Sequence, residues 1–305
     1  MPIVIEEMTM NKDEMKISVI GPGRVGSAIA IGLNQAGYDV VTIAGSSDAQ
    51  KRDDLAQRVC AEGVYCPIEA SIRANVIFLT VADSAIQSVC EQISEAGGFN
   101  ENSVVVHCSG ALGSHALHAA EKKGAKIISA HPLQTFADPK TASASLPGTY
   151  WFLEGLTSAQ EIIKPVIESL GGNVVVISAD HKPLYHAAAV VTSNCLTALI
   201  DVATRLYQAV GMSEEDARQA FAPLAKVSLE NALEKGATKA LTGPVSRGDI
   251  STIQKHLDVL KSQPVLSQEV YKTLGKVTAQ IALRDNRINK SVEHEILNLL
   301  SAREK

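Results

Sequence analysis

The chain has 305 residues, which is long for one compact core and sufficient for two domains. Hydrophobic residues make up 46% of the chain and charged residues 20%, which is the composition of a soluble globular protein. The formal net charge is −5 and no long basic run occurs, so the composition argues against nucleic acid or an anionic membrane surface as the partner.

The cysteines and the first residues bear on the compartment. Five cysteines are scattered along the chain, without a C-x-x-C pair and without a nearby histidine at metal-ligand spacing. This pattern predicts reduced thiols and no metal site. The opening residues are acidic where a signal peptide would be basic, and we find no apolar run long enough to span a bilayer. We therefore expect a cytoplasmic protein without a membrane partner.

Residues 1–15 are expected to form a tail or a loosely attached segment. From Lys16 onward, short β-branched runs bounded by Gly, Asn or Asp alternate with stretches of helical spacing. The runs that we predict as buried strands are 16–20, 39–44, 75–81, 103–108, 126–131, 149–154 and 173–178. The alternation predicts βαβ units and a mostly parallel sheet.

The alternation stops near Ser178, and only helical spacing follows. We expect helices over 181–210, after Ser213, and over 249–261, 267–284 and 292–302. The chain is therefore predicted to be an α/β domain, residues 16–178, followed by an all-α domain, residues 179–305.

The strongest motif is G-x-G-x-x-G, formed by Gly21, Gly23 and Gly26 with Arg24 and Val25 between the last two. It follows the first predicted strand directly and opens a helix, which is the context of a Rossmann-type dinucleotide site. Gly21 would allow the tight turn, Gly23 the approach of a pyrophosphate and Gly26 close helix packing. Backbone N–H groups at the helix start would hold the phosphates. The alternative is a glycine turn without a ligand.

The end of the second strand bears on the choice between NAD and NADP. An NAD site usually has Asp or Glu there, whereas this chain has Gly45, Ser46 and Ser47, followed by Lys51 and Arg52. Hydroxyl groups and cations suit a 2′-phosphate, so the sequence favours NADP. Asp48 would relax that preference if it pointed into the site. Lys51 and Arg52 can equally lie on a solvated helix face.

Two further strand ends are candidates for the wall around the nicotinamide. One strand leads into Val81 and Asp83, and the next leads into Ser109. Ligands of open parallel sheets sit at the carboxyl ends of strands, so we predict these three residues to contact the cofactor. Asp83 can instead cap the following helix.

The helix expected after Asp180 is apolar except for one narrow stripe. At 100° per residue, Lys182, His186 and Ser193 lie within roughly 40° of one another, and Asn194 lies at the flank. Buried polar groups must be paired or line a cavity, so we predict Lys182, His186 and Asn194 as catalytic residues. The alternative is a satisfied polar cluster of His186 and Asn194 at a dimer interface.

Two other polar positions remain open. His131 and Pro132 follow the strand KIISA, and we predict that His131 faces the nicotinamide; alternatively it packs in a turn that Pro132 bends. Arg247, in the loop TGPVSRGD, can clamp a substrate carboxylate or pair with Asp249 to hold the loop. Asp249 is a good N-cap for the next helix.

The motifs GPGRVG, TVADSAI, HCSGAL, SAHPLQTF, KPLYHAAAVVTSN and TGPVSRGD occur in this order. This series resembles a family of NADP-dependent oxidoreductases in which a Rossmann-like domain precedes a C-terminal domain of unknown function. More distantly, the layout is similar to pyrroline-5-carboxylate reductases, prephenate dehydrogenases and ketopantoate reductases. The resemblance covers the chain from Lys16 onward. Those dehydrogenases use Lys or His with Asn or Ser on the corresponding helix, although Lys182 and Asn194 lie farther apart than is typical there.

The resemblance implies NADP binding and oxidoreductase activity on a small polar carbonyl, imine or hydroxy acid. It also implies a homodimer joined through the helical domain. The competing hypothesis is a non-catalytic NADP-binding redox sensor or scaffold, because the cofactor carries the hydride chemistry and no single residue is compulsory.

Overall fold

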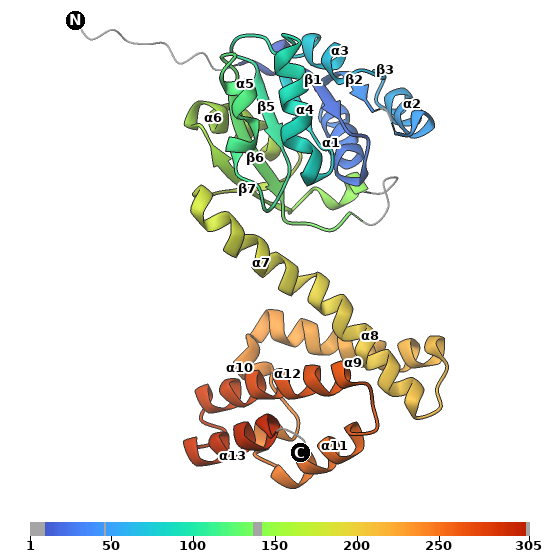
Figure 1. Cartoon of the computed structure of the whole chain (residues 1–305), viewed down its shortest axis with the longest axis vertical. Helices are drawn as coiled ribbons and strands as arrows, with labels where there is room; N and C mark the ends of the chain where they lie inside the picture. Colours follow the sequence, from blue (N-terminus) through green and yellow to red (C-terminus); the bar gives the residue numbers. More distant parts are fainter. Residues whose placement is uncertain (1–9, 46, 137–141, 303–305) are drawn as a thin grey trace, which may run out of the picture. The chain divides into compact units, whose positions relative to one another are not determined.

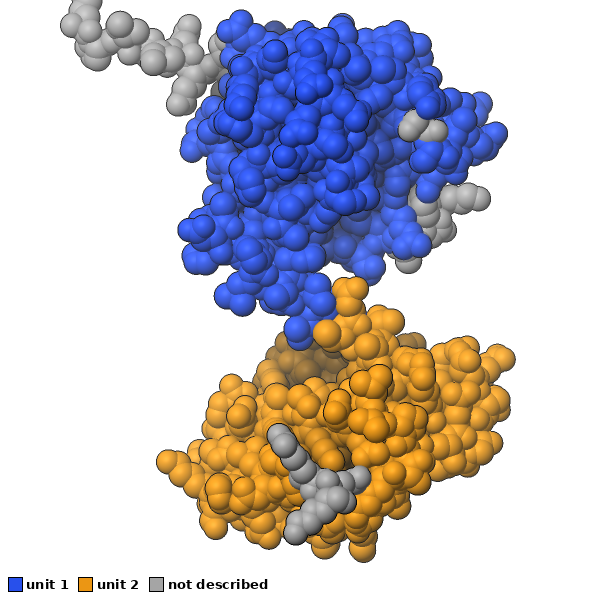
Figure 2. Space-filling view, viewed as in Figure 1, with its two compact units in different colours: residues 1–193 blue, residues 194–305 orange. Residues whose placement is uncertain are grey.

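The computed structural model describes residues 10–45, 47–136 and 142–302. The chain divides into two compact units, residues 1–193 and residues 194–305, which are coloured separately in Figure 2. The sequence predicts a domain boundary after residue 178. The last strand does end at Val176, but the helix that follows the strands is grouped with the first unit as far as Ser193.

The first unit is built on one eight-stranded sheet in the order β3-β2-β1-β4-β5-β6-β7-β8. Neighbouring strands are parallel except for β6 and β7, which are antiparallel. The fold is therefore the mostly parallel Rossmann type that the sequence predicts. The strands are β1 Lys16–Ile20, β2 Asp39–Ala44, β3 Glu62–Val64, β4 Val76–Leu79, β5 Val104–His107, β6 Lys126–Pro132, β7 Tyr150–Gly155 and β8 Asn173–Val176.

Helices cover both faces of this sheet, as Figure 1 shows. Alternate residues of β4 point to opposite cores: Phe78 packs with α1, α2 and α6, and Leu79 packs with α3, α4 and α5. Burial on both faces explains the continuous apolar runs that mark these strands in the sequence. The helices are α1 Arg24–Gln35, α2 Ala49–Arg58, α3 Pro67–Ile72, α4 Asp83–Glu95, α5 His118–Glu121, α6 Thr157–Ser169 and α7 Lys182–Thr192; short 3₁₀ turns are η1 Lys12–Glu14, η2 Ser114–Leu117, η3 Ala142–Ser145 and η4 Ala179–His181.

The described residues of the second unit are helical, with a small core around Ile253, Ala279 and Ile296. The helix expected over 181–210 is observed as one helical stretch, Ala179–Ala209, which is divided at Ser193 into α7 and α8; Ser193 itself keeps right-handed helical dihedrals, with φ of −108° and ψ of −65°. The elements are α8 Asn194–Ala209, α9 Glu214–Lys235, α10 Ala237–Ala240, η5 Val245–Arg247, α11 Ile250–Leu260, α12 Val265–Arg284 and α13 Lys290–Ser301.

The segment before β1 is more firmly attached than the predicted tail implies. Met15 is buried in the core of the first unit, and the Lys12 ammonium donates to the carbonyl of Ala36 at 2.6 Å. Residues 1–9 lie outside the described part of the chain.

One helical stretch among the described residues, Ala179–Ala209, is long and apolar enough to cross a membrane by length and composition alone. The expectation that no apolar run reaches this length therefore does not hold by this criterion. A single stretch of this kind is weak support for a membrane span. Its first turn also carries Lys182, whose ammonium is buried against polar groups of the first unit.

Candidate functional site

The glycine turn after β1 is held by Thr80, which follows β4. The Thr80 hydroxyl donates to the carbonyl of Gly21 at 2.7 Å. Gly21 has φ of +107°, and a Cβ there would lie 2.7 Å from the Thr80 carbonyl carbon. A Cβ on Gly26 would lie 2.1 Å from the Gly21 oxygen. Packing within the protein therefore explains two of the three glycines, Gly21 and Gly26.

Gly23 differs from the other two glycines of the motif. Its backbone is extended, with φ of −77°, so the conformation does not require glycine. A Cβ on Gly23 would meet only the Thr80 oxygen, at 4.0 Å. The side-chain position is therefore open space, as expected where another molecule approaches the backbone.

Gly23 is the N-cap of α1, and it supplies no side chain to the cap. Arg24 and Val25 begin the helix, and no acidic residue lies in the first turn to neutralise the positive end of the helix dipole. Backbone N–H groups of such a turn can bind a phosphate. The residues predicted for the pyrophosphate thus meet at one place, at the carboxyl end of β1.

In the loop after β2 and the start of α2, Asp48 and Arg52 both make hydrogen bonds within the protein. Asp48 is the N-cap of α2, and its carboxylate accepts a hydrogen bond from the Lys51 N–H at 3.0 Å. Arg52 donates to the Gly45 carbonyl at 3.1 Å and pairs through two nitrogens with Asp53, at 2.7 and 3.0 Å. The guanidinium is thus held beside the end of β2.

The hydroxyls predicted for this loop divide between described and undescribed residues. Ser47 is exposed, and Ser46 lies outside the described residues. Lys51 is exposed on α2, in agreement with the solvated helix face that the sequence leaves open.

Asp83 and Ser109 are joined at the ends of β4 and β5. The Ser109 hydroxyl donates to the Asp83 carboxylate at 2.6 Å and accepts from the N–H groups of Ala111 and Leu112, at 3.2 and 3.0 Å. Asp83 is the first residue of α4, whose N-cap is Ala82. Asp83 therefore holds the loop after β5, and neither of the two roles weighed from the sequence describes this contact. Val81 is half-buried beside the glycine turn.

Two more buried side chains hold the same loop, residues 108–114. The His107 ring accepts from the Ser109 N–H at 3.2 Å through Nδ1, so its other nitrogen donates to the Gly113 carbonyl at 3.0 Å. Burial is the main reason that the pKa of His107 falls to about 4, and the ring is neutral at pH 7. The Glu154 carboxylate accepts from the N–H and the hydroxyl of Ser114, at 2.5 and 2.9 Å.

Lys182 completes this set from α7. Its side chain is fully buried, and the ammonium donates to the carbonyl of Ser109 at 3.2 Å and to the hydroxyl of Ser129 at 2.7 Å. Burial lowers the pKa of Lys182, while nearby carboxylates, Glu154 first, oppose that shift. The sequence predicts a catalytic lysine, but an ammonium enclosed in this way holds the protein loop.

His131 is the second-last residue of β6, not part of a turn. Its Nδ1 is hydrogen-bonded to the Tyr185 hydroxyl at 2.7 Å, and its ring meets the His186 ring edge-on at a centroid distance of 6.1 Å. Burial is the main cause that lowers the pKa of His131 to about 4, and the charge of Lys182 adds to it.

Gly110 makes room for these two imidazoles. A Cβ there would lie 2.6 Å from Cδ2 of His186 and 2.9 Å from Nε2 of His131. The structure thus brings His131, Lys182 and His186 together at the carboxyl ends of β5 and β6. The side chain of Asn194 is exposed at the start of α8, in the second unit.

The sequence reasoning missed Tyr185, His107, Glu154 and Thr80. Tyr185 lies three residues after Lys182 and so falls just outside the stripe that was drawn from Lys182 through His186. Glu154 offered a signal, because it is a charged residue within an apolar strand.

In the second unit, the loop 242–249 is held by Asp249 and by Arg287. Asp249 accepts from the N–H of Thr252 at 3.1 Å and caps α11, as predicted. Arg287 donates to the Ser246 hydroxyl at 3.1 Å and to the carbonyl of Thr238 at 3.1 Å. Arg247 is exposed, and no ion pair within 4.0 Å joins it to Asp249 in the described part of the chain.

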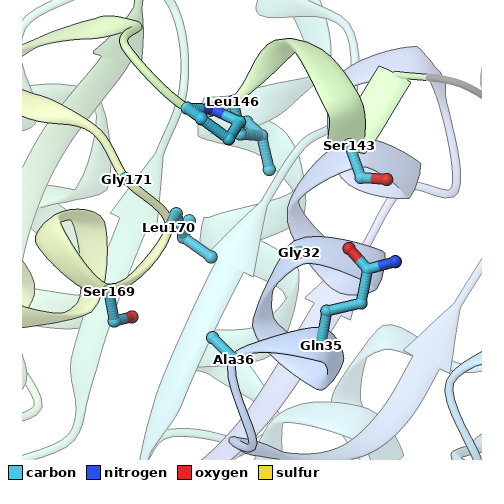
Figure 3. Close-up of a pocket in the computed structure, with 9 residues that line it drawn as sticks. Gly32, Gln35, Ala36, Ser143, Leu146, Ser169, Leu170 and Gly171 are labelled. Atoms are coloured by element: carbon cyan, nitrogen blue, oxygen red, sulfur yellow. The ribbon is translucent and has the colours of Figure 1, made fainter.

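Two of the cavities that lie away from the glycine turn are bounded by helix ends and helix faces. One, of about 270 Å³, is formed where α1 and α6 end, with Gln35, Leu146 and Leu170 in its wall (Figure 3). The negative ends of two helices disfavour a phosphate there. The other, of about 340 Å³, lies within the second unit between α8, α11 and α12 and contains the hydrogen-bonded pair of His256 and Tyr271.

The comparisons with known proteins agree with this architecture. Residues 4–132 match the model of a Rossmann-like domain, and residues 149–278 match that of a domain of unknown function, DUF2520. The chain therefore carries a Rossmann-like domain followed by a DUF2520 domain, which confirms the arrangement implied by its motifs. The DUF2520 match begins within the sheet, just before β7, and so extends across the division between the two units.

Solved structures share the fold over most of the chain. A "putative NADP oxidoreductase" from Bacteroides fragilis is 24% identical, with a TM-score of 0.72 over 88% of this chain and 99% of that one. The protein TM1727 from Thermotoga maritima is 25% identical, with a TM-score of 0.68 over 89% and 100%. A Plasmodium falciparum pyrroline carboxylate reductase with NADP bound is 14% identical, with a TM-score of 0.56 over 95% and 100%. No curated protein matches the chain.

Proposed function

We propose that the first unit binds NADP(H) at the glycine turn and that the protein is an NADP-dependent oxidoreductase. The observation that carries the proposal is the open space at Gly23, at the start of a helix with no acidic residue in its first turn. Gly21 and Gly26 are explained by internal packing, whereas Gly23 is explained by a ligand. The structure of the similar Plasmodium falciparum reductase with NADP bound supports this choice of ligand.

The preference for NADP over NAD rests on the loop after β2. Asp48, a carboxylate close to the strand end, caps α2 and accepts from the Lys51 N–H through Oδ1, which ties it to the protein backbone. Arg52 lies at the Gly45 carbonyl and offers a guanidinium to a 2′-phosphate. We propose that Ser46 and Ser47 add hydroxyl groups there. Asp53, which pairs with Arg52, would reduce the gain in affinity.

NADP(H), when bound, supplies or accepts a hydride. The reaction also needs a group that exchanges a proton or a hydrogen bond with the substrate oxygen or nitrogen. We assign that role to His186 and His131, which face one another over Gly110. Lys182 acts on the same site by holding Ser109 and Ser129. Asn194 stays a proposed substrate contact.

The proposed substrate is a small polar carbonyl, imine or hydroxy acid. A screen of such compounds, followed by NADPH absorbance, tests the activity with the wild type and with His186→Ala. We expect His186→Ala to abolish turnover while NADPH affinity and stability stay near wild-type values. The matched control is His118→Ala, which removes an exposed histidine of the same unit and should retain turnover.

Two other results would contradict the assignment of a catalytic histidine or of an enzyme. A loss of about 1–3 kcal/mol of stability in His186→Ala, with turnover retained, would mean a structural cluster. Tight NADPH binding by the wild type with no turnover of any compound would favour a non-catalytic redox sensor.

We also propose a cytoplasmic homodimer that is joined through the second unit. Large apolar side chains stand exposed there on α9 and α12: Leu224 is 64% exposed, Leu233 76%, Val265 66% and Leu266 73%. Water contact with so many apolar groups is unfavourable, and extended apolar patches usually mark an interface.

A further inference from the structure

Three aromatic rings from three elements meet at the end of β6. In the antiparallel pair of β6 and β7, His131 lies directly opposite Phe152. The ring of Tyr185, on α7, stacks on Phe152 at a centroid distance of 4.0 Å and meets His131 edge-on at 5.6 Å. Its hydroxyl lies 2.7 Å from Nδ1 of His131. The stack fixes the phenol ring, so the position of its oxygen is defined before any ligand binds.

Both groups in this hydrogen bond are neutral at pH 7. Burial raises the pKa of Tyr185 above its ordinary value, so the phenol keeps its proton. Burial, together with the neighbouring Lys182 and His186, lowers the pKa of His131, so the imidazole carries one proton. The remaining neighbours in this electrostatic environment are Asp83, which favours the imidazolium, and His107, which opposes it.

One hydrogen atom occupies the bond, and it comes either from the phenol or from Nδ1. A phenol O–H is a stronger donor than the N–H of a neutral imidazole, and an imidazole nitrogen is a stronger acceptor than a phenol oxygen, so the phenol donates to Nδ1 across the 2.7 Å between them. The neutral imidazole then carries its own hydrogen on Nε2 of His131. That Nε2 faces the space at Gly110, next to His186.

We propose that Tyr185 is a positioning residue, which fixes His131 in the tautomer that carries its proton on Nε2. His131 then presents a hydrogen-bond donor toward the space shared by Gly110 and His186. Its use on a substrate oxygen or nitrogen rests on the function proposed above, whereas the tautomer itself does not. Beside many histidines a carboxylate or a backbone carbonyl accepts a hydrogen bond from one ring N–H and so fixes the tautomer. Here the Tyr185 phenol fixes the tautomer, but it donates the hydrogen bond to the ring.

The test is ¹⁵N NMR of the imidazole nitrogens in the full-length protein, in which protonated and unprotonated ring nitrogens have distinct shifts. The His131 signals are assigned by their loss in His131→Gln. We expect the wild type to show Nε2 protonated and Nδ1 unprotonated. Tyr185→Phe removes only the hydroxyl and keeps the stack on Phe152, and the ratio of the two tautomers should fall about fivefold, the net worth of one neutral hydrogen bond.

The matched control is Tyr38→Phe, the same chemical change at a buried tyrosine that precedes β2, at the opposite end of the strands. It should leave the His131 signals unchanged. Protonated Nδ1 in the wild type, or an unchanged tautomer ratio in Tyr185→Phe, overturns the proposal. NADPH titration of the same samples separates the two claims: if none of them binds NADPH, the proposed function fails, and the tautomer result is decided by the spectra alone.

Discussion

The neutral state of His107 makes the first unit sensitive to acid. The ring is fully buried, and both of its nitrogens are used in the loop 108–114. Its pKa is about 4 in the folded protein, against 6.5 when it is unperturbed. The folded state therefore binds fewer protons than the unfolded state between these values. Stability is complete above the unfolded pKa and is lost as the pH falls toward the folded one.

The size of this loss follows from the shift. One pKa unit corresponds to about 1.4 kcal/mol, so the full shift is worth about 3 kcal/mol once both states are protonated. Between roughly pH 7 and pH 5, His107 alone should lower the free energy of unfolding by about 2 kcal/mol. His131 has a similar shift and adds its own loss, so the contribution of His107 must be isolated by substitution.

The assay uses the single tryptophan of the chain. Trp151 is fully buried in the first unit, so its fluorescence during urea unfolding reports that unit. In His107→Gln an amide N–H can still reach the Gly113 carbonyl, but the side chain does not titrate. We expect the loss between pH 7 and pH 5 to be smaller than in the wild type by about 2 kcal/mol. An exposed histidine, His115, gives the control His115→Gln, which should keep the wild-type loss.

Equal losses in the wild type and in His107→Gln would refute the reasoning. They would mean that the pKa of His107 is the same in the folded and in the unfolded protein. Burial would then not lower the pKa of this ring. Groups that titrate in both proteins cancel in this comparison, because the substitution leaves them in place.

Three further predictions concern the cofactor, the assembly and the glycine turn. Calorimetric titration should show tighter binding of NADPH than of NADH, by about tenfold or more, because the Arg52 guanidinium stands at the end of β2 and the nearby carboxylates cap α2 (Asp48) and pair with Arg52 (Asp53); equal affinities would contradict the proposed preference for NADP. Light scattering at micromolar concentration should give a dimer, and Leu266→Glu should shift the mass toward the monomer, since Leu266 is 73% exposed in the single chain. Gly26→Ala should destabilise the first unit by about 2 kcal/mol or more, because its Cβ would lie 2.1 Å from the Gly21 oxygen, whereas Gly23→Ala should change stability little.

The sequence was a good guide to the sheet because each buried strand is apolar on both faces. β3 was missed because it has only three residues, Glu62, Gly63 and Val64, and pairs at the edge of the sheet with β2 alone. The antiparallel β7 follows β6 after a segment with no regular helix among its described residues, so strand direction was not visible in the run of apolar residues.

The site was only partly predictable. The glycine turn is formed by residues that are close together in the chain, so its motif can be recognised from the sequence alone. The role of Lys182 depends on residues more than fifty positions away, Ser109 and Ser129, so helical spacing could place it on a polar stripe but could not show that its ammonium is enclosed. Tyr185 was overlooked for the same reason, since its partner His131 comes from another element.

The central claim is that the open space beside Gly23, where another residue would have its side chain, is occupied by the pyrophosphate of a bound nucleotide. Calorimetric titration of the wild type and of Gly23→Val with NADPH tests it most directly, with the Trp151 unfolding curve as a check that both proteins are folded. We predict that the wild type binds NADPH and that Gly23→Val is folded and does not bind it, because the side chain would occupy the place of the pyrophosphate. Normal NADPH binding by folded Gly23→Val, or no binding by the wild type, would contradict the account.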